Sequence, residues 1–460
     1  MPGAPVTFGE HPEVRAAFDL ARAWIEARLA HLDIPAVAVA VVRDQEILWA
    51  EGFGAADRER GIRAGPQTLF PIASVTKLFT ATAIMQLRDA GALGLDDPLA
   101  RHLPWLRLGG GEAAITVRHL LTHTSGLARE APFPYWSDFA FPGTGALRAA
   151  LSDRQCVLPP ATRWKYSNLG MTLAGEVVAA ASGVGWADHV RGRVLEPLGM
   201  ASTRTEPNPE DRSASRGYGR KLPRSERAMR PHSDLAGLAA AGGIASSVAD
   251  LAKFMMLQFR DGPAGGSQVL AGATLAEMRR VHWLDPDWRG GWGLGFRVWP
   301  EDGRTVAGHF GLMAGFASDL RLLPEMKLGV VVLTNAEDGQ PGIFAQRILQ
   351  WTAAAVTRAT PTTVAAVVDP GWSRYVGRYR DSWTDLEVLV DAAGLCIVPP
   401  HWIDPAAGMV RLVPVGPHAF RMSAGGFDYT DEVLTFELSE DGRASAVRIG
   451  LNPLHRVESW

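Results

Sequence analysis

The stretch FPIASVTKLFTATAIMQL, residues 70–87, carries the clearest structural signal in this chain of 460 residues. From Ser74 onward its pattern predicts a helix that stops near Gly91, because glycine readily adopts the left-handed conformation that ends helices. Ser74 and Lys77 are three positions apart, so their side chains share one face of the helix at its N-terminus. The hydroxyl and the amine are therefore expected to meet.

The lysine of this pair is a candidate base. Only five of the 46 lysine and arginine residues are lysines, and lysine, unlike arginine, can lose its proton when it is buried. To be half-deprotonated at pH 7, its pKa must fall by about three units, which corresponds to about 4 kcal/mol. Partial burial at the positive end of a helix can supply this shift. The spacing alone arises by chance about 0.2 times in such a chain, so a serine N-cap followed by a solvated lysine remains the alternative.

Two further motifs follow along the chain. Tyr166-Ser167-Asn168 stands directly before a predicted helix, and chance predicts only about 0.05 such matches. A tyrosine hydroxyl near an amine can relay a proton from a nucleophile to a leaving group, although a core tyrosine and an N-cap asparagine fit the same letters. The third motif, His309-Phe310-Gly311, is expected to enter a strand. By itself it does not indicate a function, because such a match is common by chance.

The surrounding pattern predicts an α/β domain. Helices are expected over residues 12–31, 168–181, 248–260 and 343–356. Strands are expected over residues 36–42, 45–50, 292–298, 315–323 and 327–335. Because strands occur at both ends of a long helical middle, we expect one antiparallel sheet flanked by helices, together with an all-helical subdomain.

The last part of the chain differs from the rest. Residues 358–371 are expected to be a linker between a hydrolase domain, residues 1–357, and a second domain, residues 372–460. This second domain consists of short alternating segments with Gly, Asp and Pro at the turns, a pattern that predicts a small β-barrel.

Composition excludes several classes of protein. With 47% hydrophobic and 21% charged residues the chain is globular, and a net charge of −3 gives no field for binding nucleic acid. Cys156 and Cys396 are 240 positions apart, which argues against a disulfide framework and for a reducing compartment. The apolar stretches are too short to span a membrane. The N-terminus MPGAPVTFGEHPEVR lacks the pattern of a secretory signal, so a cytoplasmic protein is expected.

The order of the three motifs resembles that of the serine β-lactamase-like superfamily, which includes class C β-lactamases, DD-peptidases, esterases, D-aminopeptidases and penicillin-binding-protein-type peptide cyclases. The resemblance covers about residues 15–357. It includes the blocks FPIASVTKLFTATAIMQL, ITVRHLLTHTSGL, YSNLGMTLAGEVV, VLEPLGM, AAGGIASSVADLAKFM, GWGLGF and GHFGLMAGF.

The resemblance implies a role for each matching residue. Ser74 is the acylated nucleophile, and Lys77 with Tyr166 activates it. Tyr166 then protonates the leaving group, while Asn168 orients Lys77 and the substrate. His309 lines the opposite wall of the site.

The resemblance also implies where the substrate binds. The backbone N–H groups of Ser74 and Leu312 form the oxyanion hole. Phe310 and Gly311 lie in the third motif beside the substrate. Trp136 and Trp164 stand near motif blocks and are expected to line a hydrophobic acyl pocket, although core packing explains them as well.

The third motif departs from the superfamily. Enzymes that act on β-lactams or D-Ala-D-Ala usually carry Lys-Thr-Gly there, and the cation and hydroxyl bind a substrate carboxylate. Here His309 and Phe310 remove the hydroxyl and make the charge depend on pH. Ester or amide substrates without a buried carboxylate are therefore expected.

These features predict a serine hydrolase, an esterase or D-aminopeptidase-like peptidase, that acts on a small-molecule ester, amide or peptide without a cofactor. The alternatives are a peptide cyclase or acyl-transferase, a β-lactamase or DD-peptidase, and a non-catalytic penicillin-recognising binding protein. No metal is expected, because His119 and His123 lack the glutamate of an HExxH site. The sequence predicts no oligomeric state.

The second domain resembles the lipocalin-like barrels appended to some D-aminopeptidases and peptide cyclases, through the residues YVGRY that begin at Tyr375. We hypothesise that this barrel covers part of the cleft and limits the size of the acyl chain. Deletion of residues 372–460 tests this, since an unchanged substrate range contradicts the hypothesis.

Overall fold

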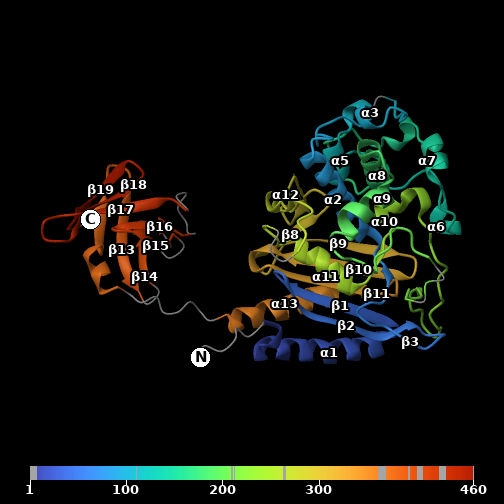
Figure 1. Cartoon of the computed structure of the whole chain (residues 1–460), viewed down its shortest axis with the longest axis horizontal. Coiled ribbons are helices and arrows are strands. Elements are labelled where there is room, and N and C mark those ends of the chain that lie inside the picture. Colours follow the sequence, from blue (N-terminus) through green and yellow to red (C-terminus); the bar gives the residue numbers. More distant parts are fainter. Residues whose placement is uncertain are drawn as a thin grey trace. The chain divides into compact units, whose positions relative to one another are not determined.

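The computed structural model describes residues 8–109, 111–208, 211, 213–262, 266–360, 369–391, 394–400, 408–423 and 431–458. The chain divides into two compact units, Met1–Ala359 and Thr360–Trp460 (Figure 1). The predicted linker falls mostly on residues 361–368, which lie outside the described residues, so the predicted domain boundaries stay a prediction.

The first unit is built on a nine-stranded sheet whose strands follow the order β3-β2-β1-β11-β10-β9-β8-β7-β6. Every pairing is antiparallel, and β1 and β2 from the start of the unit lie beside β11 from its end. The predicted sheet built from the two ends of the domain is thus confirmed. Its strands are β1 (Ala36–Arg43), β2 (Glu46–Asp57), β3 (Ile62–Arg63), β6 (Trp283–Leu284), β7 (Gly291–Trp292), β8 (Arg297–Glu301), β9 (Arg304–Met313), β10 (Phe316–Leu323) and β11 (Leu328–Thr334).

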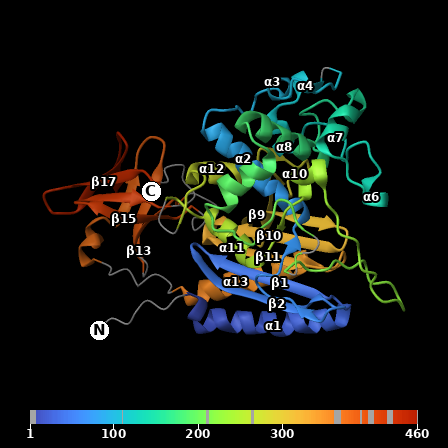
Figure 2. The ribbon, with the colours of Figure 1, turned by 45° about the vertical axis from the view of Figure 1, so that its right-hand side comes forward.

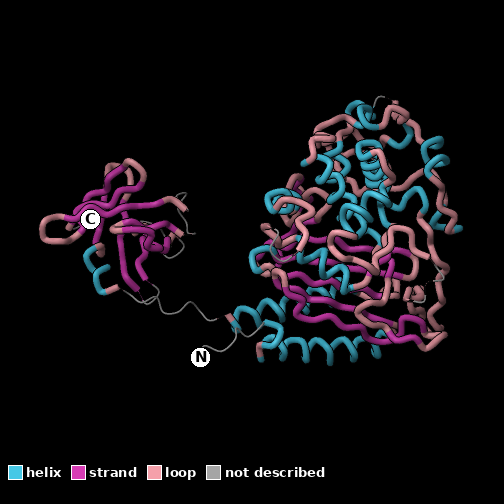
Figure 3. Tube along the Cα trace, in the orientation of Figure 1, coloured by secondary structure: helices cyan, strands magenta, loops and turns pink. Residues whose placement is uncertain are grey.

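Helices cover both faces of this sheet (Figures 2 and 3). They are α1 (Pro12–Leu32), α2 (Thr76–Asp89), α3 (Leu99–His102), α4 (Gly111–Ala114), α5 (Val117–Leu121), α6 (Tyr135–Asp138), α7 (Thr144–Ala150), α8 (Asn168–Ser182), α9 (Trp186–Val190), α10 (Ala239–Gly242), α11 (Val248–Leu257), α12 (Gly272–Met278) and α13 (Pro341–Ala359). A two-stranded sheet of β4 (Phe70–Pro71) and β5 (Ala245–Ser246) stands just before α2.

Strand β1 shows why the two faces differ. Its sequence AVAVAVVR alternates small and branched residues, and successive side chains of a strand point to opposite faces. Val37, Val39 and Val41 belong to the core formed with α1 and α13. The alanines face the other core, which contains residues of α2, α8 and α11. The helices that carry the candidate site therefore pack on the alanine face of the strand.

Two expectations from the sequence need correction. The strand expected over residues 292–298 is interrupted, because Gly295 adopts a φ of +83° and its N–H bonds to Leu121 instead of to a neighbouring strand. The third motif does not precede a strand, since His309 lies inside β9. The strand begins at Arg304 and reaches the site only in its second half.

The second unit is a closed barrel of eight antiparallel strands in sequence order, with the last strand paired to the first. Tyr379 is buried at this seam, where its hydroxyl donates to the Tyr375 carbonyl at 2.6 Å. The predicted C-terminal barrel is confirmed. Its strands are β12 (Gly377–Arg380), β13 (Asp385–Asp391), β14 (Gly394–Val398), β15 (Val410–Gly416), β16 (Ala419–Met422), β17 (Val433–Leu438), β18 (Ala444–Ile449) and β19 (Asn452–Val457).

Among the described residues, no single helix combines the length and apolar character that a membrane span requires. The segments Asn168–Ser182 and Trp186–Leu195 reach that length and composition only as a pair bent by 76°.

Candidate active site

Ser74 lies in a tight 3₁₀ turn, Ala73–Val75, immediately before α2. The preceding Ala73 has a φ of +46°, a left-handed conformation that costs an alanine about 1–2 kcal/mol. Strain of this kind is common at functional sites. The Ile72 carbonyl closes the turn by accepting the N–H of Val75 at 3.1 Å, and it also accepts the Ser318 hydroxyl at 2.8 Å. The turn thus holds the Ser74 hydroxyl at the surface of a cleft.

Lys77, in the first turn of α2, has no exposed surface. Its Nζ lies 3.0 Å from Ser74 Oγ, 2.9 Å from Asn168 Oδ1 and 2.6 Å from the Ala241 carbonyl oxygen. The carbonyl and the amide oxygen can only accept hydrogen bonds, so they occupy two N–H groups of the amine. A neutral lysine has no third N–H, and its lone pair then faces the Ser74 hydroxyl.

Burial lowers the pKa of Lys77 to about 7. The negative charge of Glu130 opposes this shift, and the positive charge of Arg129 adds to it. The fall from 10.5 agrees in size with the three units that a base acting at neutral pH requires. Its main cause is complete burial, whereas the sequence suggested partial burial at the end of a helix.

Asn168 is held in one orientation by an acidic residue. Its Nδ2 donates to Glu130 Oε1 at 2.8 Å, so its Oδ1 is left to face Lys77. The other oxygen of Glu130 accepts the Tyr135 hydroxyl at 2.7 Å. A carboxylate only accepts hydrogen bonds, so this contact settles which end of the amide faces which neighbour.

The loop between α5 and α6, which carries Arg129, is fastened to the start of α8. The Arg129 carbonyl accepts the N–H groups of Asn168 at 2.7 Å and Leu169 at 3.2 Å. Ser167 caps α8 by accepting the Gly170 N–H at 2.8 Å, and its N–H bonds to Nδ1 of the buried His123. These contacts fix the positions of Tyr166 and Asn168 relative to the loop.

The side chain of Tyr166 interacts with that of Ser74. Burial raises the pKa of the Tyr166 phenol well above 10, although the interaction with Ser74 and the charge of Arg129 oppose the shift. Lys77 Nζ lies 5.0 Å from the centre of the Tyr166 ring, and the Arg129 guanidinium lies 5.1 Å from it. At neutral pH the hydroxyl therefore keeps its proton and can donate it.

Strand β9 forms the opposite wall. Within the described residues β8 pairs with β9 only as far as Gly308, so residues 309–313 pair with β10 alone and leave their other edge free. Gly311 lies against the Ser74 turn, and a Cβ added there would stand 2.4 Å from the Ile72 carbonyl oxygen and 3.0 Å from Ala73 Cβ. Only a glycine fits this approach of two backbones.

His309 is buried in this wall and is not the pH-dependent charge that the sequence suggested. Burial lowers its pKa to about 3, and the nearby Lys77 contributes to the shift. Its Nδ1 lies 2.6 Å from the Phe310 carbonyl oxygen, where an imidazole N–H can donate. The ring is neutral at physiological pH. The third motif therefore supplies neither a cation nor a hydroxyl to the cleft.

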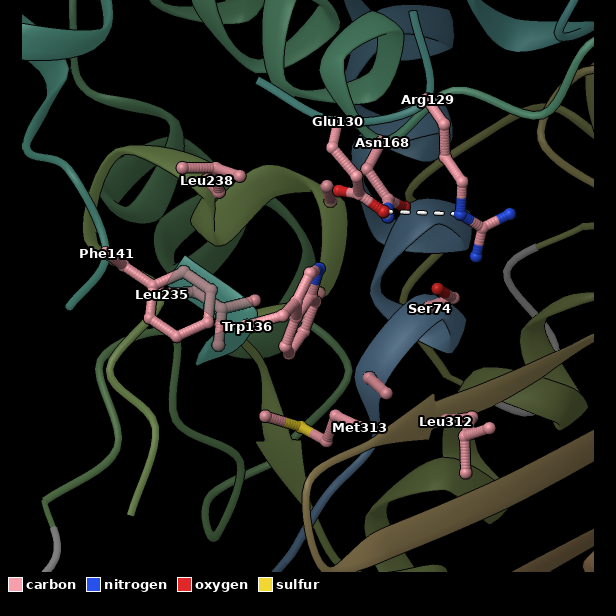
Figure 4. A pocket seen from close by; sticks show the side chains of 13 residues that line it. Ser74, Arg129, Glu130, Trp136, Phe141, Asn168, Leu235, Leu238, Leu312 and Met313 are labelled. Carbon is pink, nitrogen blue, oxygen red and sulfur yellow. Dashed lines mark hydrogen bonds and ion pairs between the residues drawn. The ribbon is translucent and has the colours of Figure 1, made fainter. Parts of the chain in front are cut away.

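The cleft beside Ser74 spans about 490 Å³, including the open solvent at its mouth, and has two unlike ends (Figure 4). Its polar end carries Arg129, Glu130 and Asn168. Its remaining lining residues are apolar or small: Ala73, Trp136, Phe141, Leu235, Leu238, Ala241, Gly242, Leu312 and Met313. A substrate whose carbonyl lies at Ser74 thus meets charge on one side and aromatic and aliphatic groups on the other.

The residues singled out from the sequence fall into two groups. The structure brings Ser74, Lys77, Tyr166 and Asn168 together, and Trp136 and Leu312 line the same cleft. Trp164 does not line this cleft.

Trp164 instead stacks on Trp292 at 5.2 Å, in an aromatic group behind Tyr166 that includes His123. Phe310 is 51% exposed on β9, but it is not among the residues that line the cleft. The sequence alone does not show whether an aromatic residue near a motif packs behind Tyr166 or lines the cleft.

Sequence reasoning missed three contributors: Arg129, Glu130 and the carbonyl of Ala241. The pair Arg129-Glu130 directly follows the block HTSGLA, and two charged residues after such a loop were the available signal. The carbonyl of Ala241 gave none, because every residue has a carbonyl.

The described residues contain no group of three His, Cys, Asp or Glu side chains placed to hold a metal ion. His119 and His123 are engaged separately. Nδ1 of His119 accepts the Thr116 N–H at 3.2 Å, while Nδ1 of His123 accepts that of Ser167 at 3.2 Å.

Comparison with known proteins agrees with this geometry. The family model described as Beta-lactamase matches residues 21–355. The chain belongs to the beta-lactamase family. The matched residues include every residue that lines the cleft, so the polar end and the apolar end described above are both parts of a beta-lactamase family domain.

Two curated relatives of this family member differ in their names. The chain is 32% identical over 319 residues to Penicillin-binding protein 4 of Amycolatopsis lactamdurans, covering 66% of this chain and 81% of the relative. It is 38% identical over 208 residues to Esterase EstB of Burkholderia gladioli, covering 40% of this chain and 49% of that protein. The match to the esterase thus spans about half of that relative.

Solved structures extend the likeness to both units. The crystal structure of SurE matches with a TM-score of 0.60 and 25% identity, covering 97% of this chain and all of that one. A D-stereospecific amidohydrolase from Streptomyces matches with a TM-score of 0.58 and 26% identity, covering 73% of this chain and 98% of that one. This beta-lactamase family member therefore has neighbours among esterases and amidohydrolases of one fold.

Proposed function

We propose that this protein is a serine hydrolase that cleaves ester or amide bonds through an acyl-enzyme on Ser74. One observation carries the proposal: Lys77 Nζ is buried 3.0 Å from Ser74 Oγ, and two acceptors occupy its N–H groups. The pKa near 7 makes this amine a base at neutral pH. A structural lysine would instead be expected to face solvent or an acidic partner.

The reaction proceeds in two halves. Lys77 takes the proton of Ser74, whose Oγ attacks the carbonyl carbon and forms a tetrahedral intermediate. The backbone N–H groups of Ser74 and Leu312 stabilise the oxyanion. Tyr166 donates its proton to the leaving alcohol or amine as the bond breaks, and the proton on Lys77 returns to Tyr166. Water then attacks the acyl-enzyme by the same route, which releases the acid and restores Ser74.

The proposed roles agree with the charges in the site. Tyr166 keeps its proton because burial raises its pKa, so it is suited to act as an acid. His309 is neutral and adds no charge beside the base. Asn168, which Glu130 orients, holds Lys77 in place with its Oδ1.

Labelling and turnover test the proposal together. The wild type should react stoichiometrically with a fluorophosphonate and hydrolyse members of a panel of p-nitrophenyl esters and D- and L-aminoacyl anilides. Ser74→Ala should abolish both signals. Ser137→Ala, which removes an exposed hydroxyl from helix α6 at the border of the cleft, should retain them. Equal labelling of both variants would contradict the proposal, and a wild type that neither labels nor turns over would favour a non-catalytic binding protein.

Acyl transfer is the second candidate function. It shares the first half-reaction and differs in using an amine in place of water to accept the acyl group. The closed C-terminal barrel, which resembles those appended to some D-aminopeptidases and peptide cyclases, supports it. Adding amine acceptors to the same panel distinguishes the two, since a transferase forms the amide product faster than the free acid. Rapid hydrolysis of a chromogenic cephalosporin would instead favour a β-lactamase, against which the neutral His309 argues.

A further inference from the structure

We infer that Arg129 binds a carboxylate on the leaving-group side of the substrate, so that the enzyme prefers esters or amides whose leaving group is an acid such as an amino or hydroxy acid. This inference rests on the proposed function, because it assigns the two sides of the cleft by the route of the proton. It identifies a residue that determines specificity outside the three motifs.

The Arg129 side chain is placed to meet a ligand. It is 60% exposed, yet it lines the cleft together with Ser74. Its backbone is fixed, because its carbonyl accepts two N–H groups at the start of α8. In Figure 4 the guanidinium extends from its loop toward the space above Ser74. A fixed backbone limits the positions that this long side chain can reach.

The guanidinium has an unoccupied edge. Its Nε lies 3.2 Å from Glu130 Oε1, and this ion pair is drawn as the dashed line in Figure 4. Among the described residues, neither Nη atom has a hydrogen-bond partner. The two terminal N–H groups of an arginine match the two oxygens of a carboxylate. Glu130 repels an anion from its own side, so a carboxylate would approach from the Nη edge.

The position of Tyr166 shows on which side of the scissile bond this edge lies. Tyr166 interacts with Ser74 and is the proposed acid for the leaving group, so the leaving group must lie next to its hydroxyl. The Arg129 guanidinium stands over the ring of that tyrosine, 5.1 Å from its centre. The apolar residues Trp136, Phe141 and Leu235 line the opposite end of the cleft, away from Arg129 (Figure 4). The acyl group therefore takes the apolar end, and the leaving group lies beside Arg129.

Among the described residues that line the cleft, Arg129 is the cationic side chain that can meet an anionic substrate. Lys77 is buried and uses its N–H groups on the protein. His309 is neutral, and its wall has no hydroxyl in place of the threonine that the superfamily usually carries. A carboxylate held at Arg129 would also remain partly in solvent, because the guanidinium is largely exposed. A substrate carboxylate would thus be bound by the loop that carries Arg129, and not by strand β9.

A matched pair of substrates tests this inference. One is a phenyl ester of an apolar acid with a carboxylate para on the leaving phenol, and the other carries a carboxamide at that position. In the wild type we expect kcat/KM to favour the carboxylate. In Arg129→Gln this preference should fall about tenfold, in line with the loss of a charge-assisted hydrogen bond. Arg129→Lys should retain part of it, since lysine keeps the charge but not the fork.

Taking the ratio of the two substrates cancels any effect of the substitution on Lys77 or on folding. Arg15→Gln, an exposed arginine on α1 on the other face of the sheet, is the control and should leave the ratio unchanged. The preference of the wild type should weaken as salt is added. A ratio that Arg129→Gln leaves unchanged, or a wild type that favours the carboxamide, overturns the inference. Both of these results require an enzyme that hydrolyses esters, so neither contradicts the proposed function. The absence of both ester hydrolysis and Ser74 labelling would contradict the proposed function itself.

Discussion

The two walls of the cleft are built on different principles. The helical wall carries side chains that can change charge or hold one: Lys77, Tyr166, Glu130 and Arg129. The wall formed by β9 contributes backbone, the apolar side chains of Leu312 and Met313, and a neutral, buried histidine. Since the charges lie on one wall, the pH dependence of the reaction should come from that wall, whereas substitutions in the strand should act through position.

The largest expected effect concerns the base. Lys77→Met removes the amine next to Ser74 but keeps a long side chain in the buried space. We expect kcat/KM to fall by about 10²–10⁴-fold, the range attributed to a general base. Steady-state kinetics with p-nitrophenyl esters measures this, and a decrease below tenfold would contradict the assignment of the base to Lys77.

The same variant gives a signature in stability. In the unfolded chain Lys77 keeps its proton up to about pH 10.4, whereas in the folded protein its pKa is about 7. Between these values unfolding takes up a proton, so this residue makes the free energy of unfolding rise with pH by about 1.4 kcal/mol per unit. The wild type should therefore gain stability relative to Lys77→Met from pH 7 to 9 and show a constant difference below pH 6. Urea unfolding at each pH measures the difference, and a flat difference throughout would mean that Lys77 is protonated.

The next effect tests the strand wall. In Gly311→Ala the new Cβ would stand 2.4 Å from the Ile72 carbonyl oxygen, so either β9 or the turn that holds Ser74 must move. A displacement of about 1 Å can reduce the rate by about 10²-fold, and we expect a decrease of this size with no shift of the pH profile. Gly192→Ala, where a Cβ meets no atom within 4 Å, should keep the rate. Full activity in Gly311→Ala would show that the reaction does not depend on the close contact between β9 and the turn that holds Ser74.

A smaller effect separates the two charges of the polar end. Glu130 raises the pKa of Lys77 and Arg129 lowers it. If Lys77 is the base, kcat/KM rises with pH as it loses its proton, near pH 7 in the wild type. Glu130→Gln should shift this rise to lower pH, and Arg129→Gln should shift it to higher pH. Profiles from pH 5 to 9 on a neutral ester measure both, and shifts in the same direction would contradict the electrostatic account.

The smallest effect expected is at His309. Because its pKa is about 3, the ring should not titrate between pH 5 and 8. Its imidazole resonances in NMR spectra should therefore stay constant across that range. Titration of His309 near pH 6.5 would contradict this prediction, because the wall formed by β9 would then carry a charge that depends on pH.

Much of the fold was predictable because its signals are local. The alternation in β1 and the apolar periods of α1, α8 and α13 gave the elements to within a few residues. The Ser74–Lys77 contact was also local, since it depends only on spacing along one helical turn. The interruption between β7 and β8 was missed, because the left-handed Gly295 outweighs the β propensity of its neighbours.

The rest of the site depends on contacts between residues distant in sequence. Lys77 bonds to the Ala241 carbonyl, 164 residues away, and to Asn168, 91 residues away. Full burial of Lys77 follows from such contacts and not from its own helix. Whether the barrel covers the cleft, as the sequence suggested, remains a prediction that the deletion of residues 372–460 tests.

The close approach of Ala73 and Gly311 has a consequence for how this enzyme can change. The spacing between β9 and the turn that holds Ser74 is set by main-chain atoms and the Ala73 methyl group, so a replacement that changes this spacing also displaces the proposed nucleophile. At the far end the boundary consists of large side chains such as Trp136 and Phe141. Substitutions at that end can therefore change which acyl groups fit. The spacing between Ser74 and β9, in contrast, is fixed by the backbone.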